Sequence, residues 1–248
     1  MFSEKWFVKN IKADYKSMSK KYGISELMCR LMVNRNIVDD ELIKSYIHPD
    51  ISMLHNPHHM KDLTKAVHIL KEKIDNNKKI RIVGDYDVDG VVSVYILYTA
   101  LKKCGANVDY EIPDRIKDGY GININIIKDA KNDNVDTILT CDNGIAAIDA
   151  IKYAKDEGMT VIVTDHHDIP FVEDENNNRK TISSEADAIL NPKQEECKYK
   201  FKKLCGAGVA FKLISALYEE TGISKEKILE YIEFLAIATV CDVVDLVD

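Results

Sequence analysis

A short apolar segment that runs directly into a cluster of acids is the feature that most constrains how this chain can fold. Residues 80–90 read IRIVGDYDVDG, so a run rich in Ile and Val is followed at once by Asp85, Asp87 and Asp89. Such a run is typical of a central parallel strand. Three carboxylates this close repel one another, and in a folded protein they are neutralised by protons or by a cation. We predict a buried strand that ends at a divalent metal site and a buried helix over residues 91–101.

Strand and helix patterns alternate after residue 75, which is typical of a mostly parallel α/β sheet flanked by helices. The preceding residues look helical and irregular. We therefore predict a helical N-terminal extension over residues 1–75 and an α/β domain over residues 76–248. Residues 173–180 are polar, lack apolar periodicity and are predicted to form an exposed, mobile loop. Besides the first strand, we predict strands at 107–112, 136–140, 160–164 and 186–190, and helices near 91–104, 122–132, 144–157, 208–220 and 224–238.

The composition narrows the class of protein. The hydrophobic fraction of 46% suffices for a sizeable core, and the six cysteines form no C-x-x-C pair, so we expect them to be reduced. No apolar stretch approaches the roughly 20 residues of a membrane span, and the N-terminus lacks the layout of a signal peptide. We expect a cytoplasmic protein without a membrane partner. The net charge of −7 argues against broad adhesion to nucleic acid but does not exclude a local basic track.

Four apolar runs of the sequence end in acids. In open α/β sheets, ligands gather beyond the carboxyl ends of the strands, so acids that are distant in sequence can meet there. One such Asp would more often be a helix cap or a turn residue, but four repeats of the pattern favour a shared site. The runs end at Asp85 with Asp87 and Asp89, at Asp142, at Asp165 and at Asp242.

The residue types in these runs indicate which metal and which reaction to expect. Carboxylates with imidazole suit Mn²⁺ or Mg²⁺ better than a cysteine-based zinc site. Six or so acids can hold two cations about 3.5–4 Å apart, which activate water and clamp phosphoryl oxygens. Phosphoester hydrolysis is the reaction that this arrangement serves best.

Two adjacent histidines, His166 and His167, directly follow Asp165. Neighbouring side chains of extended backbone do not point the same way, so we predict that one histidine is a metal ligand and the other a phosphate contact or general acid. Asp165 is a candidate to hold a ring nitrogen of a histidine. A structural turn at a strand end is the alternative for this run. A second group, His55, His58 and His59, lacks co-ligands at regular spacing and is predicted to be a polar turn.

Several motifs resemble those of the DHH phosphoesterases: DHH at 165–167, GDYDVDG at 84–90, CDNG at 141–144 and TVCDVV at 239–244. Further segments are similar to the RecJ-type single-strand-specific exonucleases within that family. These are IPDR at 112–115 with GYG at 119–121, ADAILNP at 186–192 and LCGAGVAFKL at 204–213. The resemblance runs from about residue 48 to the C-terminus.

The resemblance implies a Mn²⁺- or Mg²⁺-dependent exonuclease that degrades single-stranded DNA from its 5′ end in recombination and repair. His167 would contact the scissile phosphate, Asp165 would support it, and Arg115 would bind a substrate phosphate through its guanidinium fork. A surface ion pair in a turn is the alternative for Arg115. Single-strand-binding protein and a helicase are implied as candidate partners of a monomer. The implied metal ligands are Asp87, Asp89, Asp142, His166 and Asp242, with Asp142 bridging two ions and Asp85 a ligand or a close neighbour.

Two weaker features have two interpretations each. The glycines at 206 and 208 could free helix N–H groups for a phosphate, or could let a helix pack closely on the sheet. Lysines alternating with Tyr199 and Phe201 fit either a basic track with stacking aromatics or an ordinary exposed edge strand. These lysines are Lys193, Lys198, Lys200, Lys202 and Lys203.

Members of the resembled family continue into a DHH-associated domain and usually an oligonucleotide-binding domain, which are absent from this chain. We therefore expect a fragment with weak or absent activity. A DHH hydrolase of short oligonucleotides, cyclic dinucleotides or pyrophosphate is one alternative, but it would not explain the IPDR, GYG and GAGVAFKL segments. A non-catalytic single-strand-binding module is another, but it would be expected to have lost the metal ligands that this chain retains.

Overall fold

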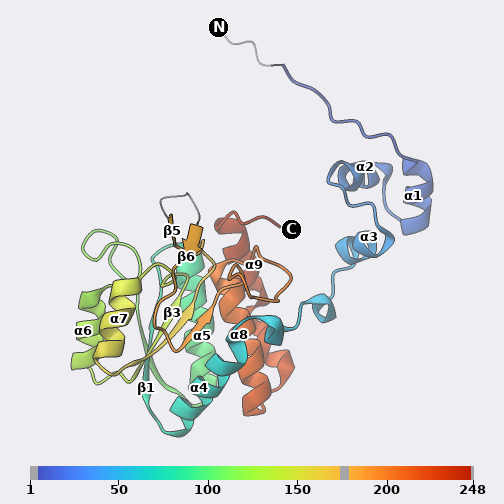
Figure 1. Cartoon of the computed structure of the whole chain (residues 1–248). Helices are drawn as coiled ribbons and strands as arrows, with labels where there is room; N and C mark the ends of the chain where they lie inside the picture. Colours follow the sequence, from blue (N-terminus) through green and yellow to red (C-terminus); the bar gives the residue numbers. More distant parts are fainter. Residues whose placement is uncertain (1–4, 174–178, 247–248) are drawn as a thin grey trace. The chain divides into compact units, whose positions relative to one another are not determined.

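A computed structural model describes residues 5–173 and 179–246 of the chain, and its backbone forms two compact units, Met1–Leu54 and His55–Asp248 (Figure 1). The predicted domain boundary at residue 75 lies after helix α4 (Leu63–Asp75), whose apolar side chains Leu63, Val67 and Leu70 belong to the core of the second unit. Among the described residues, no helix is long and apolar enough to cross a membrane.

The N-terminal unit is helical. Its helices are α1 (Tyr15–Tyr22), α2 (Glu26–Asn34) and α3 (Asp40–Ile47), followed by the short turn η1 (Ile51–Met53). Each helix begins at a polar residue, Asp14, Ser25 or Asp39, whose side chain accepts a backbone hydrogen bond from the first turn. Met32, Ile37 and Ile43 form its small core. The predicted helical N-terminal part is thus confirmed.

The second unit is built on a five-stranded parallel sheet with the strand order β2-β1-β3-β4-β7. This confirms the predicted fold class. The strands are β1 (Lys79–Val83), β2 (Asn107–Glu111), β3 (Thr137–Cys141), β4 (Thr160–Thr164) and β7 (Ala188–Leu190). Besides α4, the helical segments are η2 (Pro57–His59), α5 (Val88–Lys103), α6 (Ile124–Asn132), α7 (Ile148–Asp156), α8 (Gly206–Thr221), η3 (Lys225–Tyr231) and α9 (Ile232–Cys241).

Both faces of the sheet are covered by helices. Helices α6 and α7 lie on one side of β1 and β3, and α4, α5, α8 and α9 lie on the other (Figure 1). Successive side chains of a strand point to opposite faces, so in β3 Ile138 joins the core under α6 and α7 while Leu139 joins the core under α5 and α8. This two-sided burial explains why β3 and β4 read as mostly apolar runs. In β1 the exception is Arg81, which is buried but paired with Asp109 and Asp133.

Two predicted elements differ from the structure. The described ends of the predicted loop at 173–180 belong to an antiparallel pair, β5 (Phe171–Glu173) and β6 (Arg179–Thr181); residues 174–178 lie outside the described residues. The run ending at Asp242 is the end of helix α9 and not of a strand. A short continuous apolar run fits either a buried strand or a helix, and periodicity cannot distinguish them here.

Candidate metal centre

The acids singled out in the sequence converge at the carboxyl edge of the sheet. Asp85 follows β1, Asp142 follows β3 and Asp165 follows β4; these three strands are direct neighbours and run parallel. Asp87 caps the N-terminus of α5 through a 2.9 Å hydrogen bond from the N–H of Gly90. The fourth run reaches the same place from the C-terminal end of α9, where Asp242 lies 3.6 Å from the Nε2 of His166.

The side-chain atoms that could bind a metal form three overlapping groups. Within each group, these atoms lie within 4.8 Å of one another. Asp142 and His166 each belong to two groups, so they connect the cluster. The Nε2 of His166 lies 3.1 Å from Asp142 and 3.7 Å from Asp89. The three groups are Asp85, Asp87 and Asp142; Asp89, His166 and Asp242; and Asp142, His166 and His167.

Buried atoms at the centre of this cluster lack hydrogen-bond partners. They are Asp85 Oδ1, Asp142 Oδ1, His166 Nε2 and Asp242 Oδ2. Buried polar atoms are nearly always paired, so four unpaired atoms that can each donate a lone pair to the same region fit hard divalent cations. Burial, together with the charges of Asp89 and Asp87, raises the pKa of Asp142 to about 10. A cation is therefore the natural counterpart of this carboxylate.

The N-terminus of α8 holds Asp89. Backbone N–H groups of Gly206 and Ala207 donate to the two carboxylate oxygens of Asp89 at 2.5 and 2.9 Å. The interpretation that these N–H groups face a phosphate is therefore wrong. The close-packing alternative fits, because a Cβ on Gly206 would lie 2.6 Å from the Cβ of Asp142.

Asn143 braces the turn that carries Asp142. Its side-chain amide donates to the carbonyls of Val83 and Cys141 at 3.0 and 2.8 Å, and its carbonyl accepts from the N–H of Ile122 at 3.1 Å. Asp142 itself has a left-handed backbone with φ of 59°. These bonds join the ends of β1 and β3 and fix the position from which Asp142 enters the cluster.

Asp165 organises the histidine pair and does not enter the acid cluster. Its Oδ1 accepts from the Nδ1 of His167 at 2.7 Å, and its Oδ2 accepts from the N–H of Ile145 at 2.8 Å. Burial would raise the pKa of Asp165, but the hydrogen bonds from His167 and Ile145 hold it below its ordinary value. The ring of His166 is buried beside Asp142, whereas His167 is exposed and contacts Asp165; the two rings lie next to each other, with centroids 4.4 Å apart.

Sequence reasoning gave no role to Tyr120. Its hydroxyl donates to the backbone carbonyl of Asp142 at 2.8 Å and lies 3.2 Å from the Nε2 of His167. The flanking Gly119 and Gly121 have φ of 77° and 65°, a left-handed conformation that glycine adopts without strain. In the sequence, only these two glycines indicated that Tyr120 lies on a tightly turning loop.

Arg115 lies on the same exposed side as Tyr120. Its guanidinium carbon is 4.4 Å from the ring centroid of Tyr86, and that ring makes an edge contact with Tyr120. Arg115 forms no ion pair with a carboxylate of residues 5–173 or 179–246. Its guanidinium N–H groups are therefore not bound to an acid within the described part of the chain. The role of Arg115 toward a phosphate stays a prediction.

The stacking part of the predicted basic track is wrong, whereas the track of lysines itself stays a prediction. Tyr199 is only 2% exposed and offers no stacking surface. Lys193 pairs with Asp168, and Lys203 pairs with Asp245. Residues 197–203 form no strand, so the edge-strand interpretation is wrong as well. Phe201 packs against the core instead, which explains the aromatic pattern by burial.

The other group of histidines makes ordinary polar contacts. His58 lies 3.3 Å from Thr64 and 3.3 Å from Glu219, and the ring of His55 packs on Tyr199. Across the described part of the chain, no cluster of metal-ligating side chains includes His55, His58 or His59. This agrees with the predicted polar turn.

A parallel α/β sheet with carboxylates and an imidazole converging at its carboxyl edge defines a metal-binding domain of the phosphoesterase type. Residues 79–239 match the family model described as the DHH family, N-terminal domain, and the chain belongs to this family.

Two curated relatives are named as single-stranded-DNA-specific exonuclease RecJ. The one from Bacillus subtilis is 37% identical over 237 residues, and the one from Haemophilus influenzae is 36% identical over 203 residues. They match 94% and 79% of this chain, which spans only 28% and 33% of theirs.

Two solved structures are also similar. One is an exonuclease RecJ bound to manganese, with a TM-score of 0.64 and 33% identity over 75% of this chain and 44% of that one. The other is RecJ from Thermus thermophilus in complex with Mn²⁺, with a TM-score of 0.63 and 30% identity over 82% of this chain and 27% of that one.

Proposed function

We propose that this chain is the metal-binding part of a two-metal exonuclease that hydrolyses phosphodiester bonds of single-stranded DNA in the 5′-to-3′ direction, in recombination and repair. The observation that carries the proposal is the convergence of four unpaired buried ligand atoms, from Asp85, Asp142, His166 and Asp242. The similarity to a manganese-bound RecJ structure supports the choice of Mn²⁺ or Mg²⁺.

The groups of ligand atoms suggest how two ions would be shared. Asp85, Asp87 and Asp142 would hold one ion. Asp89, His166 and Asp242 would hold the other, with Asp142 as the bridge because it lies between both groups. When bound, such a pair of ions lowers the pKa of a water molecule and neutralises charge on the phosphoryl oxygens.

The remaining residues would bind and orient the substrate. Since the Nδ1 of His167 contacts Asp165, its Nε2, which lies 3.2 Å from the hydroxyl of Tyr120, would be the nitrogen that donates a proton to a phosphate oxygen. Arg115 can offer two parallel N–H donors to a phosphate of the strand. The cation–π contact with the neutral ring of Tyr86 would hold that guanidinium in place without neutralising its charge.

The resemblance alone carries the finer proposals that the protein works in the cytoplasm as a monomer, with single-strand-binding protein and a helicase as partners. A DHH hydrolase of small phosphate esters shares the same metal residues. The substrate assay below separates the two activities.

Calorimetric titration of the chain with Mn²⁺ tests the site, and we expect binding that Asp142→Ala abolishes. Asp149→Ala, at an exposed acid of α7, is the matched control and should bind as the unchanged protein does. In the full-length form, Mn²⁺ should support release of mononucleotides from 5′-phosphorylated single strands but not from blunt duplex. Absence of Mn²⁺ binding, or cleavage of pyrophosphate without attack on DNA, would overturn the proposal.

A further inference from the structure

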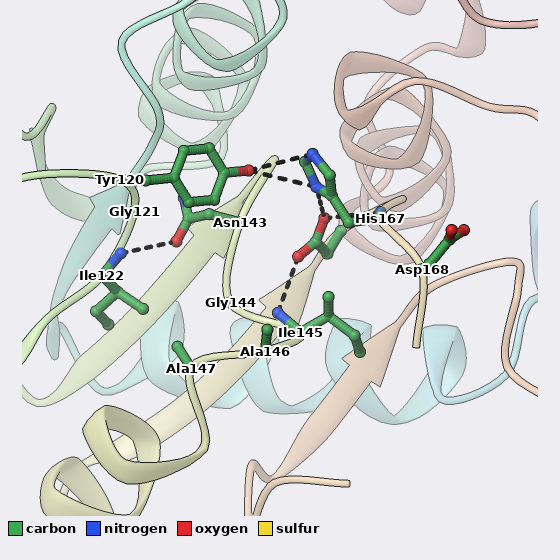
Figure 2. A pocket seen from close by; sticks show the side chains of 11 residues that line it. Tyr120, Gly121, Ile122, Asn143, Gly144, Ile145, Ala146, Ala147, His167 and Asp168 are labelled. Carbon is green, nitrogen blue, oxygen red and sulfur yellow. Dashed lines mark hydrogen bonds and ion pairs between the residues drawn. The ribbon is translucent and has the colours of Figure 1, made fainter. Parts of the chain in front are cut away.

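A cavity of about 360 Å³ opens beside the acid cluster. It is bounded by residues 120–122, by residues 143–147 and by Asp165, His167 and Asp168. Tyr120 and His167 lie on one side of it, and Ala146 and Ala147 lie on the other (Figure 2). His167 belongs both to the lining of the cavity and to a group of possible metal ligands with Asp142 and His166. The cavity therefore adjoins the place where a phosphate would react.

The lining is mostly apolar and has one aromatic ring. Ile122 and Ile145 form buried walls, Ala146 and Ala147 contribute small methyl groups, and Tyr120 supplies the ring. Pockets that bind small organic ligands typically have about 300–1,000 Å³ and such a lining, with few polar groups. A nucleobase with its sugar has this character, because the base offers flat apolar faces.

The polar side chains around the cavity already have partners. Asn143 uses its amide and its carbonyl on three backbone groups, and Asp165 uses both oxygens on His167 and Ile145. Asp168 pairs with Lys193 at 2.8 Å. Few side-chain donors or acceptors are left to read the edge of a base, so this lining would accept every base alike.

We propose that the cavity holds the nucleoside joined to the phosphate that lies at His167, without selecting among the bases. This inference rests on the proposed function. It assigns a nucleoside subsite to residues of the chain outside the metal cluster, with the ring of Tyr120 as the stacking surface. A phosphate ester without a base would leave the cavity empty.

The proposal is tested with a substitution that narrows the cavity at an exposed lining residue. Ala146→Leu adds three carbons at the rim, and Ala236→Leu makes the same change at an exposed alanine of α9 that does not line the cavity. Binding of thymidine 5′-monophosphate, thymidine 3′-monophosphate and inorganic phosphate is measured by calorimetry on the whole chain with saturating Mn²⁺. Both thymidine esters are included because the nucleoside could lie on either side of the phosphate.

In the unchanged chain, at least one thymidine monophosphate should bind more tightly than inorganic phosphate. Ala146→Leu should weaken that nucleotide by about tenfold, as for the loss of one stacked base, while Mn²⁺ and phosphate bind as before. Ala236→Leu should leave the affinities for nucleotide, Mn²⁺ and phosphate unchanged. Ala147→Leu, on the same wall, repeats the test if Ala146→Leu unfolds.

Contrary outcomes separate the two proposals. If Mn²⁺ does not bind, the proposed function fails. If Mn²⁺ and phosphate bind but the nucleotides bind no more tightly than phosphate, or if both cavity variants bind nucleotide normally, the subsite is overturned and the metal site stands. If one of the four nucleoside 5′-monophosphates binds more than about tenfold more tightly than the others, the inference that the cavity does not select among the bases is overturned.

Discussion

Gly206 lies directly against Asp142, and a Cβ on Gly206 would come within 2.6 Å of the Cβ of Asp142 and 2.8 Å of its Oδ1. Gly206→Ala must therefore displace either the carboxylate or the start of α8. Because the same N-terminus donates hydrogen bonds to Asp89, we expect this variant to weaken Mn²⁺ binding by at least about tenfold, measured by calorimetry.

Gly208→Ala is the matched control in the same helical turn. The atoms nearest to its added Cβ belong to the side chain of Leu204, at 3.2 Å, and alanine is favoured over glycine inside a helix by about 1 kcal/mol. Mn²⁺ should bind this variant as it binds the unchanged chain. If Gly206→Ala also binds Mn²⁺ normally, the close approach to Asp142 has no functional consequence.

In the absence of metal, Asp142→Asn should raise the free energy of unfolding. It should also remove most of the additional stability that Mn²⁺ gives to the unchanged chain. Oδ1 of Asp142 is buried without a partner among other acids, and relieving that cost should raise the free energy of unfolding by about 1–3 kcal/mol in the presence of a chelator. In Mn²⁺ at a hundredfold of its dissociation constant, the unchanged chain should gain about 2.7 kcal/mol and Asp142→Asn much less.

Urea unfolding with and without Mn²⁺ measures both effects, and Asp149→Asn at an exposed position of α7 should resemble the unchanged chain in each. A metal-free Asp142→Asn that is less stable than the unchanged chain would show that the carboxylate has a partner other than a cation.

Tyr120→Phe should lower stability slightly and activity more strongly. The lost hydroxyl leaves the carbonyl of Asp142 without its 2.8 Å donor, which costs about 1 kcal/mol, and it frees His167 to reorient. We expect a lower kcat with little change in KM for Mn²⁺-supported cleavage of single-stranded DNA by the full-length form.

Tyr86→Phe is the control for this change, since it keeps the ring that contacts Arg115 and Tyr120. It should leave kcat unchanged. A Tyr120→Phe enzyme with a raised KM and an unaltered kcat would argue that the hydroxyl binds substrate and does not position His167.

The sheet and the meeting of the acids could be predicted because each leaves a local pattern. Buried parallel strands read as apolar runs, and the strand ends of β1, β3 and β4 must lie at one edge. Asp242 lies beside His166, although its run is the end of a helix and the strand rule on which that expectation rested does not apply to it.

The supports of the site leave no such pattern. The hydrogen bonds between Asp89 and the first residues of α8 join positions 117 and 118 apart in the chain, and Asn143 reaches Val83 across 60 positions. Contacts between a side chain and distant backbone depend on the packed structure and not on residue type or spacing. The contacts of Tyr120 with Asp142 and His167 could not be predicted for the same reason, although its GYG motif was identified.

Asn143→Ala should be among the more destabilising changes near the site. It leaves the carbonyls of Val83 and Cys141 and the N–H of Ile122 without their partner, in a side chain that is only 1% exposed. At about 1–3 kcal/mol for each buried group left unpaired, a loss of at least about 3 kcal/mol is expected in urea unfolding. Asn125→Ala, on the exposed surface of α6, should change stability by less than about 0.5 kcal/mol. A comparably small effect at Asn143 would mean that water replaces its bonds.

Lys212 should make the stability of the second unit rise with pH in the alkaline range. This lysine of α8 is 5% exposed, its Nζ donates to the carbonyl of His55 at 2.9 Å, and among the described residues it has no carboxylate partner. Burial lowers its pKa from 10.5 to about 8. Between those values the unfolded chain binds more protons than the folded one, so the free energy of unfolding increases with pH.

Integrated over that window, Lys212 alone contributes about 3 kcal/mol. Urea unfolding at several pH values from 7.5 to 10.5 should show this rise for the unchanged chain relative to Lys212→Met, which keeps an unbranched apolar stem but does not titrate. Other titrating groups, the buried tyrosines included, are common to both proteins and cancel in the difference. Lys65→Met, at an exposed position of α4, should follow the unchanged chain at every pH. If the difference between the unchanged chain and Lys212→Met is independent of pH, the lysine is charged in the folded state, and the carbonyl of His55 compensates for its burial.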